Sequence, residues 1–119
     1  MAWLEIKDFS RIVEKLKNRL RGCTACVCYN DEVAHELTRR MLQNGKKIPE
    51  DLSVVGIDNS DLARLNPVPL TSVGHPMDAL GTRAAEMLLQ LIKNPNSDVT
   101  YEFPVEISER SSVCTYAAE

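Results

Sequence analysis

Short apolar segments alternate with longer amphipathic ones along this chain, and this alternation restricts the fold more than any other feature. Three segments are short, apolar and rich in strand-forming residues: residues 24–29, 52–57 and 70–73. Three others repeat apolar residues at helical spacing: residues 8–21, 31–44 and 75–93. This alternation predicts an α/β fold, a three-layer sandwich whose largely parallel sheet has helices on both faces. Residues 101–113 alternate in part, so we expect them to add one or two edge strands.

The last predicted helix has a continuous apolar face, which we expect to pack in the core. Its apolar residues recur mainly three or four positions apart: Leu80, Ala84, Met87, Leu88, Leu91 and Ile92. Pro76 suits the start of this helix, because the missing N–H of a proline costs nothing in the first turn.

The composition is that of a globular chain with an aliphatic core. The chain has 119 residues, the size of one domain or of a large piece of one, and is 44% hydrophobic. A net charge of −3 argues against a nucleic-acid surface, which needs a local excess of Lys and Arg. No apolar run approaches the ~18 residues of a membrane span, and the charged first residues do not form a signal peptide. We therefore expect a cytoplasmic protein that does not contact a membrane.

The four cysteines allow two interpretations. Cys23 and Cys26 have the C-x-x-C spacing of some metal sites, and Cys28 and Cys114 complete a set of four. A structural zinc site needs four converging ligands, but Cys26 and Cys28 share one face of a strand and no histidine follows at ligand spacing. Buried thiols in a reducing compartment are the better explanation, so we expect neither a metal nor another cofactor.

Polar residues follow the first two predicted strands, where a ligand of an open α/β sheet would bind. Asn30 follows the first strand and Asp58 the second. An amide offers donors and acceptors, and a carboxylate accepts from two hydroxyls, so this pair suits a polyol. From position alone, helix capping and turn formation explain the same residues equally well. Asp31 is better placed to cap the helix that it begins.

Catalytic motifs are missing from the sequence. It contains no G-x-S-x-G elbow, no glycine-rich phosphate loop and no H-E-x-x-H. His35 and His75 have no nucleophile or carboxylate partner nearby in the sequence, so we do not expect an enzyme.

Four motifs occur in order along the chain. Residues 28–34 (CYNDEVA) contain N-D-x-x-A, and residues 48–58 (IPEDLSVVGID) contain P-x-D-x-S-V-V-G-x-D. Residues 69–73 (PLTSV) and 110–112 (RSS) follow. With these motifs the chain resembles, over about residues 23–113, the C-terminal lobe of the effector-binding domain of lac-repressor/gal-repressor family regulators. It departs from the family pattern at Ile57, which is usually aromatic, and at Asn59, which is often Asp.

The resemblance implies one lobe of a fold like that of the type I periplasmic sugar-binding proteins. In this family the Asn of N-D and the Asp after V-V-G face the effector, which implies ligand-binding roles for Asn30 and Asp58. The resemblance also implies that Asp31 and Asn59 lie at helix starts and support the ligand-facing residues from behind. Residues 28–32 and 70–76 are most similar to arabinose-type repressors, which makes arabinose the candidate sugar effector.

By this resemblance we expect the sugar-binding and dimerisation part of a bacterial transcriptional repressor. Operator DNA would be bound only through an N-terminal domain absent from this chain. Residues 1–7 are then a connecting or added segment, residues 8–113 the lobe and residues 114–119 a tail. Related repressors dimerise through this lobe, which implies a homodimer with four candidate contacts: Val33, Leu37, Leu70 and Val73. The alternatives are a lobe of an exported sugar-binding protein of a transporter and an α/β enzyme with catalytic residues elsewhere.

Overall fold

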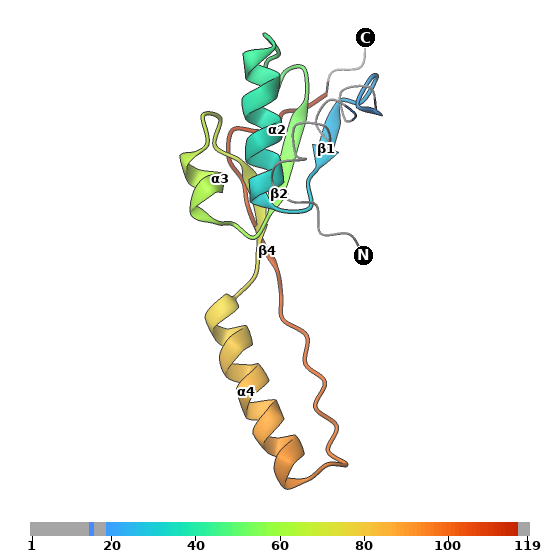
Figure 1. Ribbon diagram of the computed structural model, residues 1–119, viewed down its shortest axis with the longest axis vertical. Coiled ribbons are helices and arrows are strands. Elements are labelled where there is room, and N and C mark those ends of the chain that lie inside the picture. Colours follow the sequence, from blue (N-terminus) through green and yellow to red (C-terminus); the bar gives the residue numbers. More distant parts are fainter. Residues whose placement is uncertain (1–14, 16–18, 117–119) are drawn as a thin grey trace.

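A four-stranded sheet forms the centre of the computed structural model, which describes residue 15 and residues 19–116 (Figure 1). The strands lie side by side in chain order: β1 (Ala25–Val27), β2 (Ser53–Ile57), β3 (Thr71–Gly74) and β4 (Glu106–Ser108). β1, β2 and β3 are parallel, and β4 is antiparallel to β3. The predicted α/β fold, with its largely parallel sheet and an added edge strand, is therefore confirmed. The segment 1–7 and nearly all of the helix predicted over residues 8–21 lie outside the described residues.

One face of the sheet is covered by α2 (Asp31–Gln43) and the short α3 (Asp61–Leu65). The core consists of eight buried apolar residues: Cys28, Ala34, Leu37, Ile48, Leu52, Val54, Ala63 and Leu70. Ala34 and Leu37 come from α2 and Ala63 comes from α3. Full burial of a leucine or valine side chain contributes about 1.5–3 kcal/mol, so this small cluster fixes the helices on the sheet. None of the helices within residues 19–116 has the length and hydropathy to cross a bilayer.

α4 (Met77–Lys93) does not pack on the sheet, contrary to the prediction from its apolar face. It extends away from the sheet in Figure 1, and residues 94–105 run back beside it to β4; we call α4 and residues 94–105 the arm. No residue of α4 is buried, and Leu88 and Ile92 of the predicted core face are 59% and 69% exposed. The apolar spacing predicted the helix, but spacing does not specify which surface covers an apolar face.

One ring contact lies within residues 94–105 of the arm, and one cation–π contact joins that segment to α4. The rings of Tyr101 and Phe103 lie 4.7 Å apart, and the Arg83 guanidinium lies 4.9 Å from the centre of the Tyr101 ring. An exposed cation–π contact of this kind contributes only about 0.5–1 kcal/mol. The residues described here therefore leave most of the apolar surface of the arm open.

Candidate functional site

The carboxyl ends of β1 and β2 place Asn30 and Asp58 on one pocket. The two strands are parallel neighbours, so the loops that follow them leave the same edge of the sheet. The pocket, which we call the strand-end pocket, has a volume of about 550 Å³ and is lined by seven residues: Asn30, Asp31, Glu32, Asp58, Ser60, Asp61 and Leu62. Four of the seven are acidic, so the pocket favours ligands that donate hydrogen bonds.

Asn30 caps α2. Its side-chain oxygen accepts a hydrogen bond from Val33 N–H at 2.9 Å, and its backbone is extended, as is usual for an N-cap residue. The prediction that Asp31 caps this helix was therefore wrong, because Asp31 lies one residue inside the helix. The Asn30 Nδ2 group makes no hydrogen bond to the described part of the chain and remains able to donate to a ligand.

Asp31 instead directs its carboxylate into the protein, and the residue is only 1% exposed. One oxygen, Oδ2, accepts from the Ser60 N–H at 2.7 Å and from the Ser60 hydroxyl at 2.9 Å. The other oxygen, Oδ1, accepts from the Ser72 hydroxyl at 2.6 Å. A Cβ atom at position 56 would clash with this Oδ1 atom, so Gly56 leaves the space that the carboxylate occupies. A buried carboxylate is tolerated only where donors surround it in this way.

The turn that carries Asp58, residues 58–60, has positive φ angles at its first two residues, a conformation that is uncommon for residues other than glycine. The φ angles are +105° at Asp58 and +51° at Asn59. Three successive amides anchor this turn to different partners: Asp58 N–H to Val73 O at 2.8 Å, Asn59 N–H to Ser72 Oγ at 3.0 Å, and Ser60 N–H to Asp31 Oδ2 at 2.7 Å. The Asp58 side chain itself is exposed. The anchored backbone thus presents a carboxylate that is open to a ligand.

Asn59 does not line the strand-end pocket. Its side-chain oxygen accepts from Arg110 Nη2 at 2.6 Å, while Arg110 Nη1 donates to Leu70 O at 2.7 Å. This contact ties the turn to the R-x-S motif that follows β4. Sequence reasoning missed Ser72 as a partner of the turn, although a serine within a short apolar strand signals a buried polar contact.

The four residues predicted to contact a second copy differ in exposure. Leu37 and Leu70 are 1% and 0% exposed and belong to the core, so neither is available to a partner. Val33 and Val73 are partly buried and keep some accessible surface. Of the predicted contacts, only these two can take part in an interface without unfolding the core.

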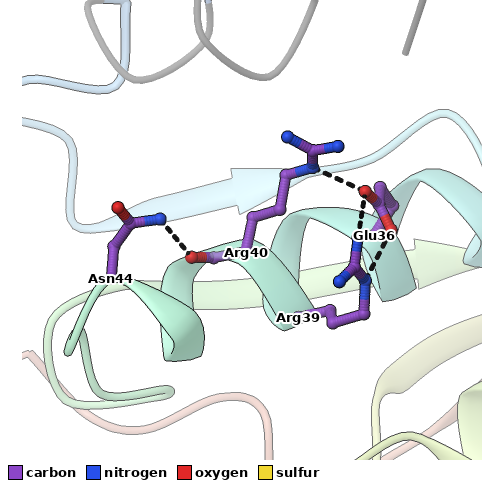
Figure 2. Close-up of polar contacts among 4 residues, drawn as sticks. All are labelled: Glu36, Arg39, Arg40 and Asn44. Carbon is purple, nitrogen blue, oxygen red and sulfur yellow. Dashed lines mark hydrogen bonds and ion pairs between the residues drawn. The ribbon is translucent and has the colours of Figure 1, made fainter. Parts of the chain in front are cut away.

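α2 also carries a charged cluster around Glu36 (Figure 2). The Glu36 carboxylate accepts from Arg39 Nε and Nη2 at 2.8 and 2.7 Å, and from Arg40 Nε at 2.5 Å. The hydrogen bonds from Arg39, joined by the one from Arg40, outweigh the opposite effect of burial and lower the pKa of Glu36 to about 2. Pairing with Glu36 raises the pKa of Arg39. Asn44 Nδ2 donates to the Arg40 carbonyl at 2.7 Å at the end of the helix. A partner that packs on this part of α2 would meet a charged surface.

Two of the cysteines form a close pair on β1 and the residue after it. The sulfur atoms of Cys26 and Cys28 lie 4.0 Å apart. A hydrogen bond from Cys28, partly offset by burial, lowers the pKa of Cys26 to about 7, and the same bond together with burial raises the pKa of Cys28. Cys28 is buried as predicted, but Cys23 and Cys114 are exposed, contrary to the interpretation of all four as buried thiols. Within the described residues, no group of three or more His, Cys, Asp or Glu side chains could hold a metal ion.

Comparison with known proteins identifies one family. Residues 2–113 match the periplasmic binding protein-like domain. The chain is 43% identical over 93 residues to the HTH-type transcriptional repressor PurR of Vibrio atlanticus, a match that covers 77% of this chain and 28% of the relative. It is 44% identical over 75 residues to the arabinose metabolism transcriptional repressor of Geobacillus stearothermophilus, with 63% and 21% covered. The chain therefore spans between 21% and 28% of the length of these relatives.

Solved structures of transcription regulators share the fold. The regulator CelR in complex with cellobiose matches 90% of this chain and 33% of its own, with a TM-score of 0.80 and 25% identity. The lac repressor dimer bound to operator and the anti-inducer ONPF matches 95% of this chain and 39% of its own, with a TM-score of 0.78 and 25% identity. A LacI family regulator from Enterococcus faecium with bound ribose matches 87% of this chain and 38% of its own, with a TM-score of 0.71 and 32% identity. A match over 95% of the chain includes most of the arm as well as the sheet.

Proposed function

We propose that this chain, which belongs to the periplasmic binding protein-like family, forms one lobe of the sugar-sensing domain of a bacterial transcriptional repressor. The observation that carries the proposal is the placement of Asn30 and Asp58 on the strand-end pocket. The Asn30 amide can donate to a ligand, and the exposed Asp58 carboxylate can accept from two hydroxyls, which together suit a polyol. The relatives named above are repressors, which favours this function over an exported sugar-binding protein or an enzyme.

The arm supports the proposal of one lobe within a larger domain. α4 has no buried residue, yet the arm belongs to the part of the chain that matches much longer regulators. This chain covers 33% of the length of the CelR chain and 39% of that of the lac repressor chain. We infer that, in the intact regulator, the remaining part of the domain covers the apolar face of α4 and completes the strand-end pocket from the opposite side. A half-pocket binds sugar weakly, so binding should be measured in the intact regulator.

Arabinose is the first sugar to test. A relative with 44% identity is named an arabinose metabolism repressor, and solved neighbours hold ribose and cellobiose. All three sugars present hydroxyl donors to an acidic pocket, so the panel should include each of them. The acidic lining disfavours negatively charged effectors unless the rest of the domain supplies cations.

Sugar would act by closing the lobes and shifting the population away from the DNA-binding form. Operator DNA would be bound by a domain outside this chain, since a net charge of −3 argues against a DNA-binding surface on this lobe. The proposed regulator is a cytoplasmic homodimer, and Val33 and Val73 are the accessible candidates for its contacts in this lobe.

The test is the substitution Asp58→Ala in the intact regulator, with operator binding measured across a titration of each sugar. Loss of a hydrogen bond to a charged group costs about 1.5–3 kcal/mol, so the sugar concentration for half-release should rise at least about tenfold. Operator binding without sugar should persist. Glu50→Ala is the matched control, because it removes the same charge from an exposed residue before β2, at the other end of that strand. Unchanged release by Asp58→Ala would contradict the assigned role.

A further inference from the structure

The geometry around Asp31 points to a positioning residue for the sugar site: its buried carboxylate sets the conformation of the turn that carries Asp58. This inference rests on the proposed role of Asp58. Asp31 lies in the wall of the strand-end pocket, yet it is only 1% exposed and both of its oxygens are occupied by donors from the protein. It therefore acts on a ligand through other residues.

The contacts of Asp31 connect the segments that follow β1 and β2 with β3 itself. Asp31 begins the helix after β1, Ser60 lies 29 residues later in the loop after β2, and Ser72 lies 41 residues later within β3. The clash of any side chain at Gly56 with the Asp31 carboxylate shows how closely β2 passes this group. The carboxylate thus links the two segments that line the pocket to each other and to β3.

Two of the three anchored amides in the turn depend on Asp31. The Ser60 N–H donates directly to Asp31 Oδ2 at 2.7 Å. The Asn59 N–H depends on it through Ser72: because the Ser72 hydroxyl donates to Asp31, its lone pairs are left to accept from Asn59 at 3.0 Å. Asp58 immediately precedes these amides and has a φ of +105°. Such a conformation persists only when the surroundings hold it, and Asp31 supports two of the three backbone anchors of the turn.

The first measurement is hydrogen exchange of the 58–60 amides in the intact regulator, without sugar, for Asp31→Asn against the parent. An asparagine keeps the size of the side chain but places a donor where an acceptor is needed. We expect exchange of the Asn59 and Ser60 amides to accelerate by about tenfold or more, as loss of a hydrogen bond to a charged group implies. Ser72→Ala, a milder change, should accelerate Asn59 and carries the test if Asp31→Asn does not fold.

Ser112→Ala is the matched control for destabilisation. Ser112 is 0% exposed, accepts from the Thr71 N–H at 2.8 Å and donates to Val54 O at 2.5 Å, two bonds that involve neither Asp31 nor residues 58–60. It should lower the unfolding midpoint without changing exchange at residues 58–60 or the sugar response. Equal acceleration by Ser112→Ala would show that Asp31→Asn acts by general destabilisation, and would overturn the inference.

The second measurement is a double-mutant cycle in the sugar titration. If Asp31 acts only through Asp58, Asp31→Asn should weaken the sugar response about tenfold alone but add less than about twofold to Asp58→Ala. Additive effects would overturn the inference, as would unchanged exchange at the 58–60 amides. If Asp58→Ala leaves the response unchanged, the proposed function of Asp58 fails, while the exchange data still decide whether Asp31 holds the turn.

Discussion

Substitution of Gly56 by alanine tests whether the space beside Asp31 is as restricted as the structure indicates. The new Cβ atom would clash with Asp31 Oδ1 and force the carboxylate away from its donors. Overpacking of a buried site costs about 1–3 kcal/mol, and loss of one hydrogen bond to a charged group costs about 1.5–3 kcal/mol. We therefore expect Gly56→Ala to lower the free energy of unfolding by about 4 kcal/mol. That is a large share of the roughly 5–15 kcal/mol that stabilises a typical domain.

The assay is equilibrium urea unfolding of the chain and its variants, followed by circular dichroism at low protein concentration. Gly81→Ala is the matched control: position 81 has open space around a new Cβ and lies inside α4, so alanine should stabilise by about 0.5–1 kcal/mol. Asp31→Ala removes the carboxylate that a Cβ atom at position 56 would meet. The destabilisation of the Gly56→Ala/Asp31→Ala double variant should therefore be smaller than the sum of the two single effects by about 1–3 kcal/mol. A loss below about 1 kcal/mol for Gly56→Ala, or additive single effects, would refute the reasoning.

Three further predictions concern other parts of the chain. Because the pKa of Cys26 is about 7, the rate of its alkylation by iodoacetamide should rise as the pH passes through about 7, while buried Cys28 stays unmodified. Equal labelling of Cys26 and Cys28 in peptide mapping would contradict this. Thr38 is buried and its hydroxyl has no hydrogen-bond partner among the described residues. Thr38→Val should therefore raise the free energy of unfolding in urea by up to about 1 kcal/mol, and a decrease would indicate that the hydroxyl has a partner. The folded pKa of Glu36, about 2, lies below its usual 4.5, so its stabilisation is present above pH 4.5 and is lost as the pH falls through about 2. The difference between parent and Glu36→Gln should follow that course and stay at or below about 1 kcal/mol, because the pairs lie on the helix surface, where solvent still screens them.

The sequence predicted the placement of Asn30 and Asp58 because it depends on topology alone. Parallel strands joined by right-handed connections leave their carboxyl ends at one edge, and both residues end such strands. The family resemblance placed Asp31 at a helix start behind the ligand-facing residues, but its hydrogen-bond partners were not predictable in the same way. Its donors lie 29 and 41 residues away, and a local pattern of an acid at a helix start suggests a cap instead.

The arm marks a second limit of sequence reasoning. The apolar spacing of Leu80, Leu88 and Ile92 predicted a helix with one apolar face, and that helix is present. Spacing measures amphipathicity, whereas the covering surface is set by tertiary contacts that can come from a distant segment. The same limit applies to Leu37 and Leu70, since an apolar residue on a helix or strand can equally well serve a core or an interface.

The edge formed by β1 has a consequence for handling the isolated chain. Within residues 19–116, β1 pairs with β2 alone, and Val27 and Tyr29 beside that edge are 71% and 85% exposed. The arm offers a different apolar surface, distant from β1 in Figure 1. If the β1 edge of one molecule binds the arm of another, the contact is heterologous, so it can form open chains of molecules and not only a symmetric dimer. The mean size of the oligomers formed by the isolated chain should therefore increase with protein concentration. Charged substitutions on β1 should limit these oligomers to a few molecules.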